Sequence, residues 1–329
     1  MDPLAPIVGN DATRARLWRA AVDGRLHHCY LFEGPEGVGK RLTAMRFTLA
    51  LNCEAPVGAE PCGRCAACRL ILAGTHPDVT VVEPDPGRAT VLITAEQARG
   101  ILAGLSLQRH SARRRVIVID PADALGEEAA NALLKTLEEP PPHTQFILVT
   151  SRAASLLQTV RSRSQRVRFG PVPEGELGPW LRARGLDPAL ARDAMGSPGL
   201  ALRLAEGEAT ERQQVREALL RAVGQPIHAL FAFTEANGKK GDDEVGAARV
   251  VDALEELLRD VVCTAAGRPV RHPHPQLRDW TRALWPGGVS RVEGAVALAR
   301  ERMRLNVNGR TVLDALLSTL NLELSQVTR

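Results

Sequence analysis

Aromatic side chains are scarce in this sequence: they make up 3% of its 329 residues, whereas apolar residues of all kinds make up 44%. The hydrophobic cores must therefore be built mainly from leucine, valine and alanine, which is typical of helical and α/β proteins. Long apolar runs are also lacking, and none approaches the ~20 residues that span a bilayer. The start of the chain, residues 1–4, has neither a signal-peptide nor a transit-peptide pattern. We expect two or three domains, no membrane association and a cytoplasmic location.

Lysine is nearly absent among the basic residues, since only four of the 42 are lysine, and the net charge is +4. So small a charge does not indicate a protein that coats DNA along its length. The arginine bias is typical of a GC-rich genome, and most surface arginines are expected to be solvated. Two arginine clusters stand out, at 113–115 and 161–168. The second is interpreted either as a strand with solvated alternate residues or, at Arg163, as part of a functional motif.

A phosphate-binding loop is present but lacks one component. Residues 34–41 fit the pattern G-x-x-x-x-G-K-[ST] except at the last place, where Arg41 replaces the residue that holds Mg²⁺. The context supports the motif, because a buried strand at 28–33 precedes it and a helix follows it. The residues expected to face a phosphate are Gly34, Gly37, Gly39 and Lys40. The scaffold is that of a nucleotide-driven protein, but arginine cannot ligate a metal.

A second strand of the expected sheet ends in an acid with no base beside it. The apolar run at 116–120 ends in Asp120, as in a buried parallel strand whose C-terminal end faces a ligand. An active ATPase of this type has a glutamate next, which polarises the attacking water. Here the next residue is Pro121, and Asp123 stands two residues further on. Asp120 is interpreted as the remnant of a Mg²⁺ site or as a strand-end turn acid.

Cysteine is also scarce, with six residues, yet four of them are clustered. These four follow the spacing Cys53-x8-Cys62-x2-Cys65-x2-Cys68. In a cytoplasmic protein this spacing favours thiolate metal ligands over disulfides, and four thiolates suit a structural Zn²⁺ with no open position. Cys65 and Cys68 are expected on one face of a short helix. An iron–sulfur cluster and free buried thiols are the alternatives, and Cys29 and Cys263 are expected in the core.

The pattern of elements divides the chain into three parts. Residues 1–170 alternate strands and helices, which indicates a parallel sheet covered on both faces. Strands are expected at 28–33, 78–82, 116–120, 145–150 and 165–169. Residues 171–207 predict short helices broken by glycine and proline, and residues 208–329 predict helices only. The last helix, at 311–322, has an apolar stripe for packing or oligomerisation, formed by Val312, Leu313, Leu316, Leu317 and Leu320.

Several stretches together resemble one family. Residues 7–10 are similar to its entry box, and 26–41 continue the similarity into the phosphate-binding loop. The cysteine insert at 53–68 follows the next helix, where the family carries a zinc module. The most specific stretch is 130–141, which reads Ala-Asn-Ala-Leu-Leu-Lys-Thr-Leu-Glu-Glu-Pro-Pro, and 162–164 is similar to the family motif Ser-Arg-Cys with serine in third place. The sequence resembles the clamp-loader subunits of bacterial DNA polymerase III, which are AAA+ proteins.

The resemblance implies an architecture. It implies an α/β AAA+ P-loop domain over 1–170, with the zinc module at 53–68 inside it. A small helical lid domain would follow at 171–207. An all-helical collar domain, which would hold the oligomer together, would occupy 208–329.

The resemblance also implies roles for single residues. Arg163 matches the arginine finger that such subunits insert at a neighbour's nucleotide, and Thr150 falls near the sensor position of its strand. Gly199 stands where an active motor has a second sensing arginine. A retained finger beside the departures at Arg41, Pro121 and Gly199 fits a non-hydrolysing, stator-like subunit rather than the gamma/tau motor.

The implied partners are the gamma/tau motor subunits and the delta subunit, and indirectly the sliding clamp and primed DNA. The chain would then be a noncatalytic subunit of a DNA polymerase complex with structural Zn²⁺. Whether the loop at 34–40 binds ATP and Mg²⁺ stays open. Two other functions stay open as well: an active AAA+ ATPase motor with a nonstandard Mg²⁺ site, and a zinc-containing DNA-binding module.

Overall fold

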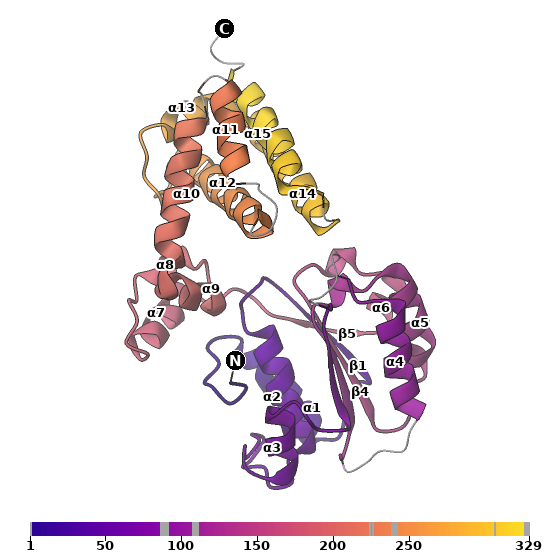
Figure 1. The fold of residues 1–329 in the computed structure, drawn as a ribbon. Helices are drawn as coiled ribbons and strands as arrows, with labels where there is room; N and C mark the ends of the chain where they lie inside the picture. Colours follow the sequence, from indigo (N-terminus) through magenta and orange to yellow (C-terminus); the bar gives the residue numbers. More distant parts are fainter. Residues whose placement is uncertain are drawn as a thin grey trace. The chain divides into compact units, whose positions relative to one another are not determined.

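The computed structural model of the chain describes residues 2–85, 92–106, 112–223, 225, 227–237, 243–305 and 307–325. The chain forms two compact units, Met1–Leu202 and Arg203–Arg329, and each is described by itself below (Figure 1). Within the described residues, every helix is too short or too polar to cross a bilayer.

The first unit is built on a parallel sheet of five strands. The strands are β1 (Cys29–Glu33), β2 (Val79–Val82), β3 (Arg115–Ile119), β4 (Thr144–Thr150) and β5 (Gln165–Arg168). Their order in the sheet is β2-β3-β4-β1-β5, and all neighbours run parallel. The strands predicted from apolar runs are confirmed to within one residue at each end.

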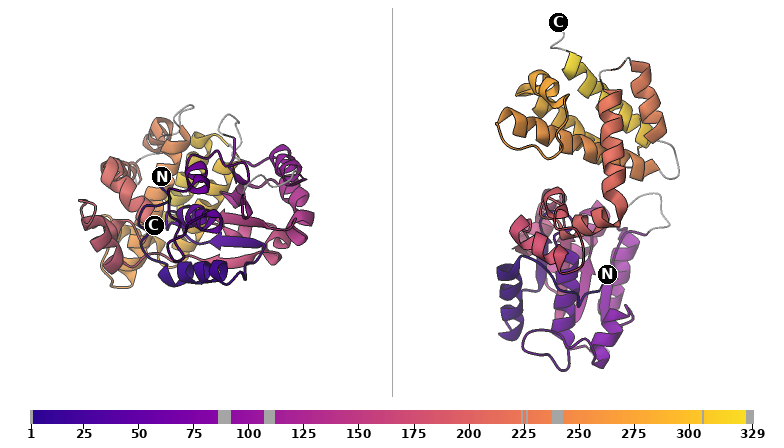
Figure 2. Two further views of the ribbon diagram at one scale, coloured as in Figure 1. Left: turned by 90° about the horizontal axis from the view of Figure 1, so that it is seen from below. Right: turned by 90° about the vertical axis from the view of Figure 1, so that its left-hand side faces the viewer.

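Each face of this sheet has its own hydrophobic core. Along β1, Cys29 and Leu31 belong to one core and Tyr30 and Phe32 to the other, because successive strand side chains point to opposite faces. The first core is covered by α4 (Ala95–Ser106), α5 (Glu127–Glu138) and α6 (Gln158–Ser162). The second is covered by α1 (Asp11–Val22) and α2 (Lys40–Asn52). Figures 1 and 2 show these helices on the two sides of the sheet, as predicted for repeated βα units.

Short elements complete the first unit. The helices are α3 (Ala66–Leu72), α7 (Glu174–Arg182), α8 (Leu190–Asp193) and α9 (Pro198–Arg203), with single turns η1 (Ala122–Ala124) and η2 (Ala153–Ser155). The breaks predicted after position 171 are confirmed, since Gly185 and Gly196 both have positive φ between the helices. Pro198 occupies the first position of α9, where its missing N–H is not needed.

The second unit is entirely helical within its described residues. After the kinked turn η3 (Leu204–Glu208) come α10 (Ala209–Ala222), α11 (Ile227–Asn237), α12 (Asp243–Ala265), α13 (Leu277–Leu284), α14 (Gly287–Arg304) and α15 (Gly309–Ser325). The long helix α12 packs against each of α10, α11, α13, α14 and α15 around one core. The apolar stripe predicted for the last helix is confirmed, because all five of its side chains are buried.

Candidate functional site

The loop between β1 and α2 has a backbone that depends on glycine. The φ angles of Gly34, Gly37 and Gly39 are 147°, 73° and 91°, values that side-chain-bearing residues rarely adopt. Gly34 also lies against the end of β5, where an added Cβ would be 2.1 Å from the carbonyl oxygen of Phe169. The geometry of the loop itself therefore requires the glycines that the phosphate-binding pattern predicted.

The ammonium of Lys40 is turned onto its own loop. Its Nζ donates to the carbonyl oxygens of Gly34 at 2.8 Å and of Pro35 at 2.5 Å. Burial lowers the pKa of the Lys40 ammonium, and the negative charge of Asp120 opposes that shift. The lysine predicted to face a phosphate thus closes the loop through backbone carbonyls in this arrangement.

Helix α9 packs directly on this loop. The backbone N–H of Gly199 donates to the carbonyl oxygen of Gly37 at 2.9 Å. An added Cβ on Gly37 would lie 2.1 Å from Oγ of Ser197, and one on Gly199 would lie 3.0 Å from Cα of Gly37. Close backbone packing therefore favours glycine at position 199, where the resemblance expects motors to have a sensing arginine.

Arg41 pairs with two carboxylates at the carboxyl edge of the sheet. Its Nη1 lies 3.2 Å from Oδ2 of Asp120, at the end of β3, and also bonds to Glu83, which follows β2. Burial raises the pKa of Asp120, and the charge of Arg41 opposes that shift. The arginine that replaces a metal-binding residue thus brings its own positive charge to the predicted acid. Glu83 was missed, although its position directly after a predicted strand was a usable signal.

Thr150 is engaged by a buried acid. Its hydroxyl donates to Oδ1 of Asp123 at 2.6 Å. The other carboxylate oxygen of Asp123 accepts from Nε of Arg152 at 3.0 Å and from Nη2 at 2.5 Å. The Asp123 side chain is only 2% exposed, so these bonds satisfy a carboxylate that water hardly reaches. The sequence placed Thr150 at the strand end correctly but gave no sign of its partner, because the two residues are far apart along the chain.

Arg163 lies at the surface, directly after α6. Its Nε donates to Oε1 of Glu138 at 2.6 Å, its Nη2 bonds the same oxygen, and its Nη1 donates to the carbonyl oxygen of Thr159 at 2.9 Å. The next residue, Ser164, anchors the backbone, since its Oγ donates to the carbonyl oxygen of Val160 at 2.8 Å and lies 3.2 Å from Sγ of Cys29.

One interpretation of the arginine cluster at 161–168 was a strand throughout, and it is wrong for the first residues of the cluster. Arg161 belongs to α6, and β5 begins only at Gln165. Backbone bonds from Arg161 to Leu157 and from Arg163 to Val160 hold the helical turn. Arg161 and Arg163 therefore do not share one face of an extended strand.

The two arginines of β5 are also paired rather than simply solvated. Arg166 donates through Nε and Nη2 to the carboxylate of Glu33, with contacts from 2.7 to 3.0 Å. Arg168 adds a bond from Nε at 3.1 Å. Glu33 is buried at the end of β1, immediately before the loop, so the arginines neutralise a charge that burial would otherwise penalise.

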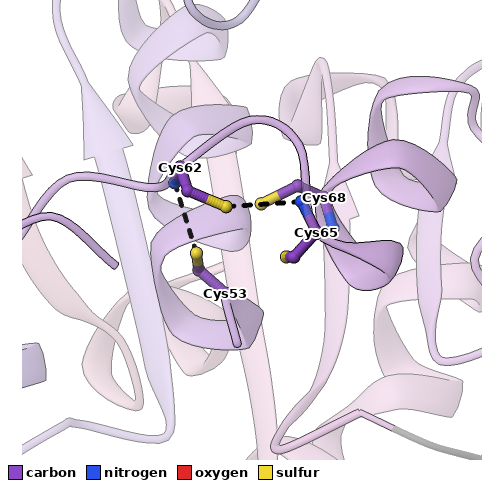
Figure 3. Close-up of side chains that lie close together, drawn as sticks. All are labelled: Cys53, Cys62, Cys65 and Cys68. Atoms are coloured by element: carbon purple, nitrogen blue, oxygen red, sulfur yellow. Dashed lines mark hydrogen bonds between the residues drawn. The ribbon is translucent and has the colours of Figure 1, made fainter. Parts of the chain in front are cut away.

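The four clustered cysteines come together as predicted (Figure 3). Their sulfur atoms all lie within 4.8 Å of one another. Cys53 follows α2, Cys65 is the N-cap of α3 and Cys68 lies within α3. The backbone N–H groups of Cys62, Cys65 and Cys68 donate to the preceding sulfur of the set at 3.2, 3.3 and 3.4 Å. Of the other two cysteines, Cys29 is buried as expected, whereas Cys263 is only partly buried.

The donor set suits a metal ion that prefers sulfur. Four thiolates at about 2.3 Å from a zinc ion stand about 3.8 Å apart, which is compatible with the observed cluster. Backbone N–H groups of Arg64 and Cys65 lower the pKa of the Cys62 thiol to about 6, whereas burial raises the pKa of Cys68. A bound cation would favour the thiolate form at every position, including the buried one. The cluster can therefore hold a metal ion.

The fold and the loop together define a class: a parallel α/β domain with a glycine-dependent loop after its first strand. Comparison with known proteins narrows it, since residues 9–173 match the family profile described as DNA polymerase III, delta subunit. The DNA polymerase III subunit delta' of Pseudomonas aeruginosa is 36% identical over 223 residues, covering 65% of this chain and 67% of that protein. The delta' subunit of Escherichia coli is 36% identical over 209 residues, covering 62% of this chain and 61% of its own length. The chain belongs to the family of DNA polymerase III delta-prime clamp-loader subunits.

More distant similarities extend beyond this family. The tau subunit of Escherichia coli is 33% identical over 254 residues, which cover 72% of this chain but 39% of tau. Among solved structures, a gamma subunit-related protein of Thermotoga maritima aligns with a TM-score of 0.42 at 16% identity, covering 95% of this chain and 99% of that chain. The RuvB Holliday junction branch migration motor of the same organism aligns with a TM-score of 0.43 at 19% identity, covering 82% of this chain and 86% of that chain.

Proposed function

We propose that this chain is a clamp-loader subunit that hydrolyses no ATP and supplies Arg163 to nucleotide bound by a neighbouring motor subunit. One contrast carries the proposal. In the chain's own loop, Lys40 is only 7% exposed and bonds backbone carbonyls, and Arg41 pairs with Asp120 where a motor would hold Mg²⁺. Arg163 lies outside this loop, directly after α6, with its side chain 31% exposed. The chain is thus poorly suited to act on its own nucleotide and well suited to act on another subunit's.

The finger would act on charge that develops during phosphoryl transfer. The transferring group spreads negative charge over its oxygens, and a planar guanidinium can bond two of them at once. Such an arginine supplied by a neighbouring protein raises the rate by roughly 10³–10⁵ in other systems. The anchoring of Ser164 to Val160 supports the backbone from which Arg163 would extend.

The four cysteines would hold one structural Zn²⁺. Because Cys53, Cys62, Cys65 and Cys68 supply four sulfurs, the ion would have no open position for water or substrate. Its contribution would be to fix the connection from the end of α2 to the first turn of α3, a segment separate from the phosphate loop.

The remaining parts would serve assembly. The short helices at 171–207 would form a lid that packs on the phosphate loop, a role supported by the bond from Gly199 to Gly37. The helices at 208–329 would form a collar that holds the complex together. The partners would be gamma/tau motor subunits and the delta subunit, and the assembly would act on the sliding clamp at primed DNA.

The test is reconstitution with the motor and delta subunits of the same organism. The chain should co-purify with them, have no ATPase activity alone, and raise the DNA- and clamp-stimulated ATPase of the complex. Turnover by the isolated chain that is lost in Lys40→Ala would instead identify a motor. Tight, salt-sensitive DNA binding without assembly would identify a DNA-binding module.

A further inference from the structure

The guanidinium of Arg163 is already held by a carboxylate of its own chain. Glu138 is the last residue of α5, and it accepts from Nε and Nη2 of Arg163, which follows α6. The edge formed by Nε and Nη2 is one through which arginine donates two parallel hydrogen bonds to phosphate oxygens. While Glu138 occupies it, the edge is closed to a nucleotide.

The geometry of the pair favours release over permanent attachment. Both donors converge on a single oxygen, Oε1, instead of bonding one oxygen each, so the pair lacks the two-oxygen fork that makes arginine–carboxylate contacts strongest. The Arg163 and Glu138 side chains are 31% and 46% exposed, and ion pairs at such exposure contribute little. A phosphate carries more charge than one carboxylate and can displace it, above all where water is excluded.

The surroundings allow the side chain to move while the backbone stays fixed. Ser164 is bonded to Val160 and lies against Cys29 of β1, which holds the chain immediately after Arg163. Turning the guanidinium away from Glu138 also breaks the bond from Nη1 to the carbonyl oxygen of Thr159, but it requires only rotation of the arginine side chain and no rearrangement of the helices.

We propose that Glu138 is a latch: a positioning residue that holds Arg163 back until nucleotide in a neighbouring subunit displaces it. The proposal rests on the proposed finger role of Arg163. Arg163 can bind phosphate only while it is free of Glu138. Its apparent affinity for phosphate is therefore its intrinsic affinity multiplied by the fraction of molecules in which the guanidinium is free. The latch thus restrains hydrolysis in complexes whose subunits are not yet closed on nucleotide.

The test is kcat/KM for ATP of the reconstituted complex, with Glu138→Gln in this chain and Glu139→Gln as the matched control. Glu139 is the adjacent exposed acid, so its removal changes the net charge equally. Glu138→Gln should raise kcat/KM without clamp or DNA by about two- to fivefold, the range expected for an exposed ion pair. Glu139→Gln should leave it unchanged. The gain should shrink at high salt and vanish when Arg163→Ala is combined with Glu138→Gln.

The outcomes separate the two proposals. If Arg163→Ala lowers the ATPase but Glu138→Gln leaves kcat/KM unchanged or lowers it, the latch is overturned and the finger role stands. A gain that persists in the Arg163→Ala background also overturns the latch, because Glu138 would then act through another residue. If Arg163→Ala itself leaves the ATPase unchanged, the finger role is overturned, and the latch proposal, which rests on it, is overturned as well.

Discussion

The guanidinium of Arg41 lies 3.2 Å from the carboxylate of Asp120, and this contact joins the first turn of α2 to the end of β3. Glu83, after β2, bonds the same guanidinium nitrogen. A side chain of the protein thus neutralises the acids at the sheet edge, a task that in P-loop enzymes falls to Mg²⁺.

Removing this arginine should not by itself create an ATPase. Arg41→Thr restores a potential metal ligand, but Pro121 still provides no base to polarise water. The isolated variant should therefore show no ATP turnover above that of the unchanged chain, in a steady-state assay with Mg²⁺. Robust turnover by Arg41→Thr would mean that another group, such as Asp123, acts as the base.

The same variant should lose stability in a pH-dependent way. Burial raises the pKa of Asp120, so its ionised form opposes folding, and losing the Arg41 charge raises that pKa further. Because Arg41 is 43% exposed, the expected loss at pH 7 is only about 0.5–1 kcal/mol. The loss should shrink as pH falls through the raised pKa of Asp120, because the protonated carboxyl no longer gains from the Arg41 charge, and it should be absent near pH ~3, where Asp120 is largely protonated in the folded and the unfolded state. Urea unfolding at pH 7 and at pH ~3 checks this, and a loss that grows in acid would contradict it.

Purified protein should contain about one zinc per chain. Elemental analysis with X-ray absorption should find zinc bound by sulfur at about 2.3 Å, and Cys65→Ser should lose most of it. Cys263→Ser, outside the cluster, is the control and should retain the metal in full. Removing zinc should loosen 53–68 in hydrogen exchange while the strands stay protected, because the sheet cores lie elsewhere. Freshly prepared, reduced protein without metal would count against the site.

Gly37→Ala should be more destabilising than Gly24→Ala. Both glycines have similar positive φ, 73° and 66°, so both alanines meet similar backbone strain. Gly24 has open space around its Cα, whereas a Cβ on Gly37 would lie 2.1 Å from Oγ of Ser197. The difference in unfolding free energy should be about 1–3 kcal/mol and should fall in a Ser197→Ala background. Equal losses in both variants would mean that α9 does not pack on the loop in solution.

Much of this architecture could be predicted from local patterns. The runs leading to Glu33 and Asp120 are apolar throughout, as strands covered on both faces must be, so their positions were nearly right. The cysteine spacing predicted a cluster because its ligands are close in sequence. A strand was one of the two interpretations of the cluster that contains Arg161, and it is wrong there because the few residues of this turn carry no clear period and tertiary packing decides its conformation.

The partners of three polar side chains at the site could not be predicted from the sequence. Glu83 reaches Arg41, Asp123 reaches Thr150 and Glu138 reaches Arg163 across separations of 42, 27 and 25 residues. Each pair forms because parallel strands bring their carboxyl ends to one edge, or because neighbouring helices end side by side. Such neighbours depend on strand order, which no single segment encodes.

The central claim is that Arg163 acts on nucleotide held by another subunit, and one measurement tests it most directly. Steady-state ATPase of the reconstituted complex, with clamp and primed DNA, should be compared for Arg163→Ala, Arg163→Lys and the control Arg161→Ala. Arg163→Ala should leave assembly and zinc content intact yet slow the site it serves by roughly 10³-fold or more. Arg163→Lys should rescue poorly, because lysine lacks the planar fork, and Arg161→Ala should retain activity. Full activity in Arg163→Ala complexes would contradict the account.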